Sequence, residues 1–143
     1  METFGRPSGK VRRPCHNLVL IARTPGSYSR PVPYYLAGYA IECGLKACVL
    51  AFVERTGVIF QDKKFLEKCW THDIEALVKA ADLEMTRGLD ISANPDLGAN
   101  WLVVKDWSEV ARYQQWTEFQ ARKLYEAVTE TANGVLPWVR VHW

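Results

Sequence analysis

The feature that most constrains this chain is an apolar stretch of helix length, residues 34–53, which contains only two charged side chains. These are Glu42 and Lys46, four residues apart. On a helix they share one face with the acidic residue nearer the N-terminus, which is the favourable order for an ion pair. The remaining positions are apolar or small, so other elements should cover most of this helix. We therefore expect it to be the central helix of a small helical domain.

Two glycines, Gly38 and Gly44, lie within this stretch. Each costs roughly 1 kcal/mol relative to alanine in a helix interior. Such glycines are tolerated where a neighbouring helix backbone comes close.

A transmembrane helix is the alternative interpretation, because the stretch is about as long as a bilayer is thick. Two charges near its middle would each be costly in lipid. Basic residues flank both ends, Arg30 and Arg55, so the flanks give no bias in orientation. We favour a helix that does not contact a membrane. The N-terminus shows no secretory signal pattern, and the expected location is the cytoplasm.

The composition of the 143 residues fits one domain with a real core. The formal net charge of +2 is too weak to indicate a nucleic-acid partner by itself. Several of the six tryptophans should be buried or lie at an interface. The cysteines have no Cys-x-x-Cys spacing, so we expect no zinc site and no cofactor; they are Cys15, Cys43, Cys48 and Cys69.

Residues 1–33 are rich in Gly, Pro, Ser and Arg, and we expect an irregular N-terminal segment there, followed by a helical domain over residues 34–143. The apolar run at residues 18–22 could be a turn of helix or a strand. Basic residues near the N-terminus could touch nucleic acid, but a solvated tail is the favoured interpretation; they are Arg6, Lys10, Arg12 and Arg13.

Capping signals divide the rest of the chain. Gly57 is a plausible stop for the central helix. Thr71 is expected to cap a helix that ends near Gly88. Asn94 followed by Pro95 indicates a further helix start.

A long helix is expected over residues 107–132. Asp106 with Glu109 three residues later predicts a capping box at its start. The aromatic C-terminal residues 134–143 should pack back on the other helices. The predicted fold class is all-α, an antiparallel bundle of about five helices with an irregular N-terminal segment.

Three segments resemble the motifs of one family, in the expected order. Residues 35–47 read Tyr-Leu-Ala-Gly-Tyr-Ala-Ile-Glu-Cys-Gly-Leu-Lys-Ala. Residues 71–74 read Thr-His-Asp-Ile and are followed by Leu77, and a later element runs from Trp107 to the pair Arg112-Tyr113. Together they resemble the HEPN family (higher eukaryotes and prokaryotes nucleotide-binding), from about residue 34 to the C-terminus.

This resemblance implies a small helical bundle that commonly forms a homodimer. Members often belong to prokaryotic toxin–antitoxin or defence systems, frequently beside a minimal nucleotidyltransferase. Many are metal-independent endoribonucleases that use an Arg, four to six further residues and then a His on one helix. The Arg would stabilise phosphate charge and the His would transfer a proton or position the ribose hydroxyl.

The chain departs from that motif. After Arg112, the positions at which the His should fall hold Thr117, Glu118 and Phe119. None of these side chains can replace an imidazole as a near-neutral acid–base group. By this test the sequence resembles a branch that lacks the nuclease motif.

Arg112 is the strongest single candidate for a site. Near a helix N-terminus its guanidinium would complete a phosphate cradle, and an ion pair with Glu42 is an equal alternative. Tyr113 could stack on a base, although half-buried packing is favoured.

His72 and Asp73 are adjacent and could act in acid–base chemistry, but local capping is favoured because neighbours on a helix diverge. Glu42 and Lys46 could line a polar site between subunits, or simply form a pair that fixes helix register, which is favoured. His142 is a weaker candidate.

The sequence is compatible with three functions. The first is a binding module that holds RNA, a nucleotide or a partner nucleotidyltransferase without cutting. The second is a purely structural interaction protein. The third is an endoribonuclease that uses His72 or His142 in place of the expected histidine.

Overall fold

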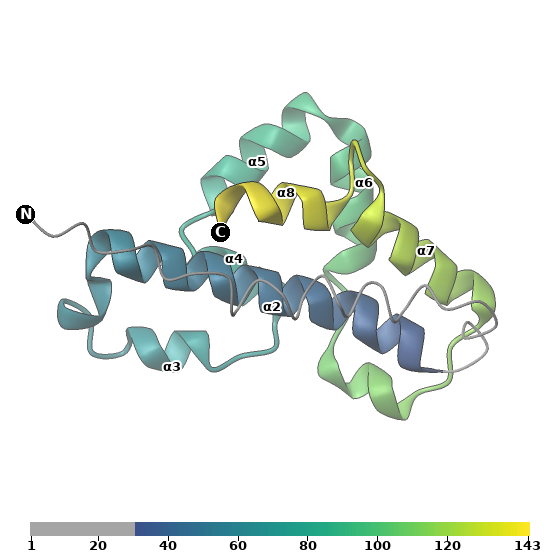
Figure 1. Ribbon diagram of the computed structural model, residues 1–143, viewed down its shortest axis with the longest axis horizontal. Coiled ribbons are helices and arrows are strands. Elements are labelled where there is room, and N and C mark those ends of the chain that lie inside the picture. Colours follow the sequence, from purple (N-terminus) through teal and green to yellow (C-terminus); the bar gives the residue numbers. More distant parts are fainter. Residues whose placement is uncertain (1–30) are drawn as a thin grey trace, which may run out of the picture.

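The structure, a computed structural model, describes the backbone of residues 31–143 and the side chains from residue 33 on. All regular elements in this range are helical (Figure 1). The prediction of an all-α bundle is confirmed, with seven α-helices in this range rather than about five; predictions about residues 1–30 lie outside the described residues. The elements are α2 (Pro31–Thr56), η2 (Val58–Phe60), α3 (Phe65–Cys69), α4 (Ile74–Ala80), α5 (Glu84–Ala93), α6 (Pro95–Val104), η3 (Glu109–Tyr113), α7 (Glu118–Thr129) and α8 (Val135–His142), where η marks a 3-10 helix.

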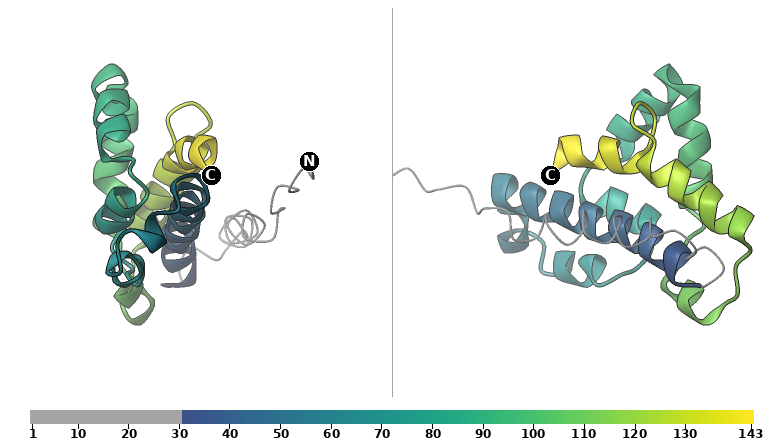
Figure 2. Two further views of the ribbon diagram at one scale, coloured as in Figure 1. Left: turned by 90° about the vertical axis from the view of Figure 1, so that its left-hand side faces the viewer. Right: turned by 45° about the vertical axis from the view of Figure 1, so that its right-hand side comes forward.

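The central helix is α2, which contacts α4, η3, α7 and α8. Figures 1 and 2 show α8 lying along α2, with α5 and α6 standing out beyond it. The helix begins at Pro31, earlier than expected, because prolines fit the first turn, where their missing N–H would have no partner. It ends before Gly57, whose φ of 64° suits glycine.

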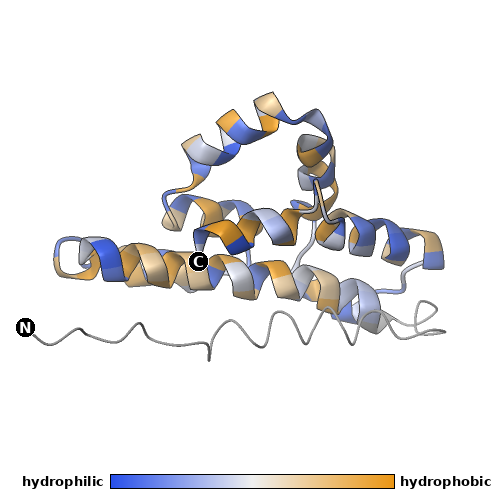
Figure 3. Cartoon of the chain, turned by 45° about the horizontal axis from the view of Figure 1, so that its top comes forward, coloured by the Kyte–Doolittle hydropathy of each residue, from blue (hydrophilic) through white to orange (hydrophobic). Residues whose placement is uncertain are grey.

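Among the described residues, α2 is the one helix whose length and composition would allow it to cross a membrane. Its apolar character is visible in Figure 3. However, 56% of its most apolar window is buried inside the bundle, which also fits the core helix of a globular domain.

Both glycines of α2 lie under side chains from other elements. A Cβ added at Gly38 would lie 2.3 Å from the indole ring of Trp107, which precedes η3. A Cβ at Gly44 would lie 2.9 Å from Cγ1 of Val139 in α8. Both glycines therefore make room for side chains, and not for the backbone of a neighbouring helix.

The helix expected from Thr71 to Gly88 is instead two helices. Asp73, not Thr71, is the N-cap of α4, and its Oδ1 accepts a hydrogen bond from the Ala76 N–H at 2.9 Å. Asp82 then adopts a positive φ of 59° and separates α4 from α5. Gly88 lies inside α5 and therefore does not end a helix, contrary to expectation.

The prediction of one helix over residues 107–132 is wrong for residues 107–117, and the helix that does form ends at Thr129. The chain forms η3, becomes extended at Gln114, and starts α7 only at Glu118. The capping box belongs to Thr117 and Gln120. Two contacts prevent this segment from forming an α-helix. Trp107 packs on Gly38 of α2, and Trp116 Nε1 donates a hydrogen bond to the Ala111 carbonyl at 2.9 Å.

Two other boundary predictions are confirmed. Asn94 caps α6, accepting a hydrogen bond from the Leu97 N–H, and Pro95 occupies the first helical turn. The C-terminal residues form α8, which packs on α2, with buried Val139 lying against Gly44.

Candidate functional site

The candidate site is built around Glu42, a carboxylate in the middle of α2 that is only 1% exposed. Its Oε1 accepts hydrogen bonds from Lys46 Nζ at 2.7 Å and from His72 Nδ1 at 2.9 Å. The pair with Lys46 was predicted from the spacing of four residues. The contact with His72 was not, because it joins residues thirty positions apart. We call Glu42, Lys46 and His72 the Glu42 cluster.

The Glu42 cluster reaches the surface through its two nitrogen-bearing side chains. Lys46 is 39% exposed and His72 is 51% exposed. A lysine ammonium has three N–H donors, and an imidazole has a second ring nitrogen. Contact with one shared oxygen therefore leaves polar groups of both side chains available to a ligand.

On its buried side, the hydrogen bonding of the cluster is less complete. Within the described residues, Glu42 Oε2 is buried and has no hydrogen-bond partner. A buried carboxylate oxygen without a donor is costly. The cost is offset here by the two charge-assisted bonds to Oε1. Glu42 is therefore held in place by the same two side chains that it positions.

Asp73 does not join its neighbour His72 in a catalytic pair. Its carboxylate caps α4, and its own N–H donates to Thr71 Oγ1 at 3.0 Å. The favoured interpretation of Asp73 as a local cap thus holds. His72 instead turns toward α2 and Glu42.

Among the described residues, Arg112 and Tyr113 form no hydrogen bond or ion pair with the Glu42 cluster. Arg112 is in the last turn of η3 and not near a helix N-terminus, so the expected position at a helix start is wrong. The alternative ion pair with Glu42 is also wrong, because Glu42 contacts Lys46 and His72. The Arg112 guanidinium lies over the Tyr113 ring, 4.6 Å from its centre. Tyr113 is 76% exposed rather than half-buried.

A hollow of about 410 Å³ lies beside His72, between the start of α4 and the segment from α6 to η3. Three carboxylate side chains and one lysine line this hollow; they are Asp73, Asp106, Glu109 and Lys105. That balance does not favour an anion inside this hollow. A phosphate would have to approach His72 from the Lys46 side.

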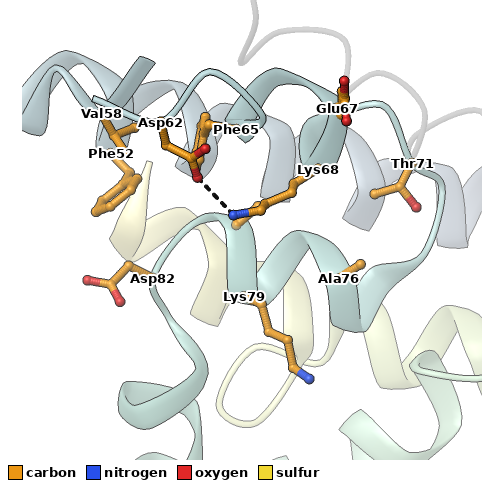
Figure 4. Close-up of a pocket in the computed structure, with 11 residues that line it drawn as sticks. Phe52, Val58, Asp62, Phe65, Glu67, Lys68, Thr71, Ala76, Lys79 and Asp82 are labelled. Carbon is orange, nitrogen blue, oxygen red and sulfur yellow. Dashed lines mark hydrogen bonds and ion pairs between the residues drawn. The ribbon is translucent and has the colours of Figure 1, made fainter. Parts of the chain in front are cut away.

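A larger hollow of about 620 Å³ lies between α3 and α4 and is shown in Figure 4. Lys68 crosses it to form an ion pair with Asp62 at 2.9 Å, which lowers the pKa of that carboxyl. Glu67 and Asp82 also line it. Sequence reasoning did not single out these residues, and none of the predicted site residues lines this hollow.

No cluster of three or more His, Cys, Asp or Glu side chains in residues 31–143 is arranged to hold a metal ion.

His142, the weaker candidate, packs against Trp138 in α8, with ring centres 4.5 Å apart. Burial lowers the pKa of His142 below its ordinary value of 6.5, and the nearby Asp90 opposes this shift. The stability linked to this residue is therefore present above pH 6.5 and lost as pH falls through the lowered pKa.

We expect wild type to lose stability on acidification relative to the His142→Gln variant, which has no imidazole to protonate. Urea unfolding of both proteins, above and below pH 6.5, measures the difference. An unchanged difference between the two proteins across this range would contradict the burial of His142.

Comparisons with protein-family models, curated proteins and solved structures found no match for this chain.

Proposed function

We propose that this protein is a helical module that binds RNA or a nucleotide through the Glu42 cluster without cutting it. One observation carries the proposal: a buried carboxylate holds a lysine ammonium and an imidazole at one point of the surface. The ammonium can donate to phosphate oxygens, and so can Nε2 of the imidazole when both ring nitrogens carry protons. Because Glu42 fixes them in advance, less side-chain freedom is lost when a phosphate binds.

The resemblance to the HEPN family supports the same proposal. Two of the three segments that resemble that family supply the members of the Glu42 cluster, residues 35–47 and residues 71–74. By the same resemblance we propose a homodimer that works in a prokaryotic toxin–antitoxin or defence system, with a minimal nucleotidyltransferase as partner.

A metal-independent endoribonuclease is the second candidate, and the contact between His72 and Glu42 favours it. With Nδ1 donating to Glu42, Nε2 of a neutral imidazole is an acceptor. It could remove the proton of a ribose 2′-hydroxyl while that oxygen attacks phosphorus and the bond to the 5′-oxygen breaks. The leaving oxygen would take a proton from Lys46 or water. We rank cleavage second because His142, the other histidine of the described residues, contacts Trp138 in α8 and not the cluster.

The decisive experiment measures binding and cleavage of a fluorescein-labelled oligouridylate without metal ions. Lys46→Ala and His72→Ala should each weaken binding several-fold at low salt, since each removes one phosphate contact worth about 1 kcal/mol. The affinity of wild type should fall as salt rises, and less steeply in Lys46→Ala. The matched control is Lys123→Ala, which removes an exposed lysine from α7.

Intact RNA with reduced binding in both variants supports the binding module. Cleavage by wild type that disappears in His72→Ala would replace it with the nuclease. Binding that is equally weakened by Lys123→Ala would mean that general surface charge, and not the Glu42 cluster, attracts the RNA.

A further inference from the structure

An apolar groove of about 470 Å³ begins at the Glu42 cluster. Lys46 forms one end of it, and α2 and α3 form its walls. Lys46 is the one charged side chain among the described residues that line the groove. The same lysine therefore belongs both to the Glu42 cluster and to an apolar surface next to it.

The outer wall of the groove is unusually exposed for apolar side chains. Trp70 is 88% exposed, Leu66 is 57% exposed and Leu50 on α2 is 43% exposed. Large exposed apolar patches in a folded protein mark interaction sites. Trp70 is also two positions before His72, so the covalent chain keeps it close to the Glu42 cluster.

The chemistry of this surface points to one kind of occupant. A nucleotide has an anionic phosphate joined to a flat, largely apolar base, and base stacking on tryptophan is the usual contact of single-stranded nucleic acid with protein. Here a cation stands at one end of the groove and an exposed indole forms its wall. An apolar partner helix would match the groove but would offer no acceptor to the N–H donors of Lys46 that its bond to Glu42 leaves available.

We propose that the groove holds an unpaired base whose phosphate binds at Lys46 and His72, so that the ligand is single-stranded RNA and not a duplex. This inference rests on the proposed function and names its substrate class. Bases in a duplex are stacked and paired within the helix and cannot lie against Trp70. Trp70 is a binding residue in this arrangement, and the Glu42 cluster sets where the phosphate lies.

The experiment measures fluorescence anisotropy of labelled oligouridylate, alone and annealed to oligoadenylate, with the whole chain of 143 residues. Wild type should bind the single strand at least about tenfold more tightly than the duplex. Trp70→Ala should weaken single-strand binding by roughly tenfold, as expected for the loss of one stacking contact. Trp70→Phe should retain most of the affinity, because it keeps an aromatic face.

Phe119→Ala is the matched control, since Phe119 is an aromatic side chain of similar exposure (74%) on α7. It should leave both affinities unchanged.

Equal affinity for duplex and single strand would overturn the inference. So would a Trp70→Ala variant that binds like wild type while Lys46→Ala does not, and that result would leave the proposed function standing. Binding that is insensitive to both Lys46→Ala and His72→Ala would instead overturn the proposed function.

Discussion

Replacing Trp107 by alanine is expected to lower the free energy of unfolding by about 3–5 kcal/mol, the usual cost of deleting a large core aromatic. Trp107 is 3% exposed and lies directly on α2 at Gly38. Its ring centre is also 5.9 Å from that of Tyr35. Because Trp107 fixes η3 to α2, its loss should leave a cavity that the surrounding backbone can fill only in part. Urea unfolding followed by circular dichroism measures the change.

Trp70→Ala is the control for this experiment, because Trp70 is 88% exposed. Its effect on stability should stay within about 0.5 kcal/mol, as for most surface substitutions. A Trp107→Ala variant that lost less than about 1 kcal/mol would contradict the packing of Trp107 on α2.

Gly38→Ala should also destabilise the protein, although alanine is the better helix former. Alanine gains roughly 1 kcal/mol over glycine in a helix interior. Against this gain, the new methyl group would lie 2.3 Å from the Trp107 ring. A rigid indole between α2 and η3 cannot turn aside as a flexible side chain could. Overpacking of this kind typically costs 1–3 kcal/mol and occasionally more, so we expect a net loss of about 2 kcal/mol.

Gly88→Ala gives the matched control with the opposite sign. Gly88 lies inside α5, and a Cβ there would meet nothing within 4 Å. This variant should gain up to about 1 kcal/mol. In the double variant Gly38→Ala with Trp107→Leu, the loss should be smaller than the sum of the single losses, since the smaller side chain makes room for the methyl group. Equal stabilisation by both alanine substitutions would contradict the close contact at Gly38.

The sequence predicts best those contacts that local spacing determines. Glu42 and Lys46 are one helical turn apart, so their ion pair follows from the helix itself. Asn94 and Pro95 likewise carry a complete local start signal. His72 reaches Glu42 only through the tertiary fold, and no periodicity in a single sequence could locate that contact.

The errors arise where two local signals compete and packing decides between them. Asp106 with Glu109, and Thr117 with Gln120, both resemble capping boxes, and only the second one forms. The outcome depends on Trp107, which is seated on α2 and so prevents an early start of the helix. Trp70 shows the same limit, because composition predicts that several tryptophans are buried or at an interface but not which ones, and the fold leaves Trp70 on the surface.

The Glu42 cluster joins two points of the chain that lie on either side of η2 and α3. Glu42 and His72 are thirty positions apart, so the segment between them forms a loop closed by one carboxylate. Closing a loop costs only about 0.6 kcal/mol more when its length doubles. Insertions or substitutions between Gly57 and Trp70 could thus reshape the groove wall during evolution while Glu42 and His72 stay in register. The proposed phosphate contact and the proposed base contact can in this way change independently of each other.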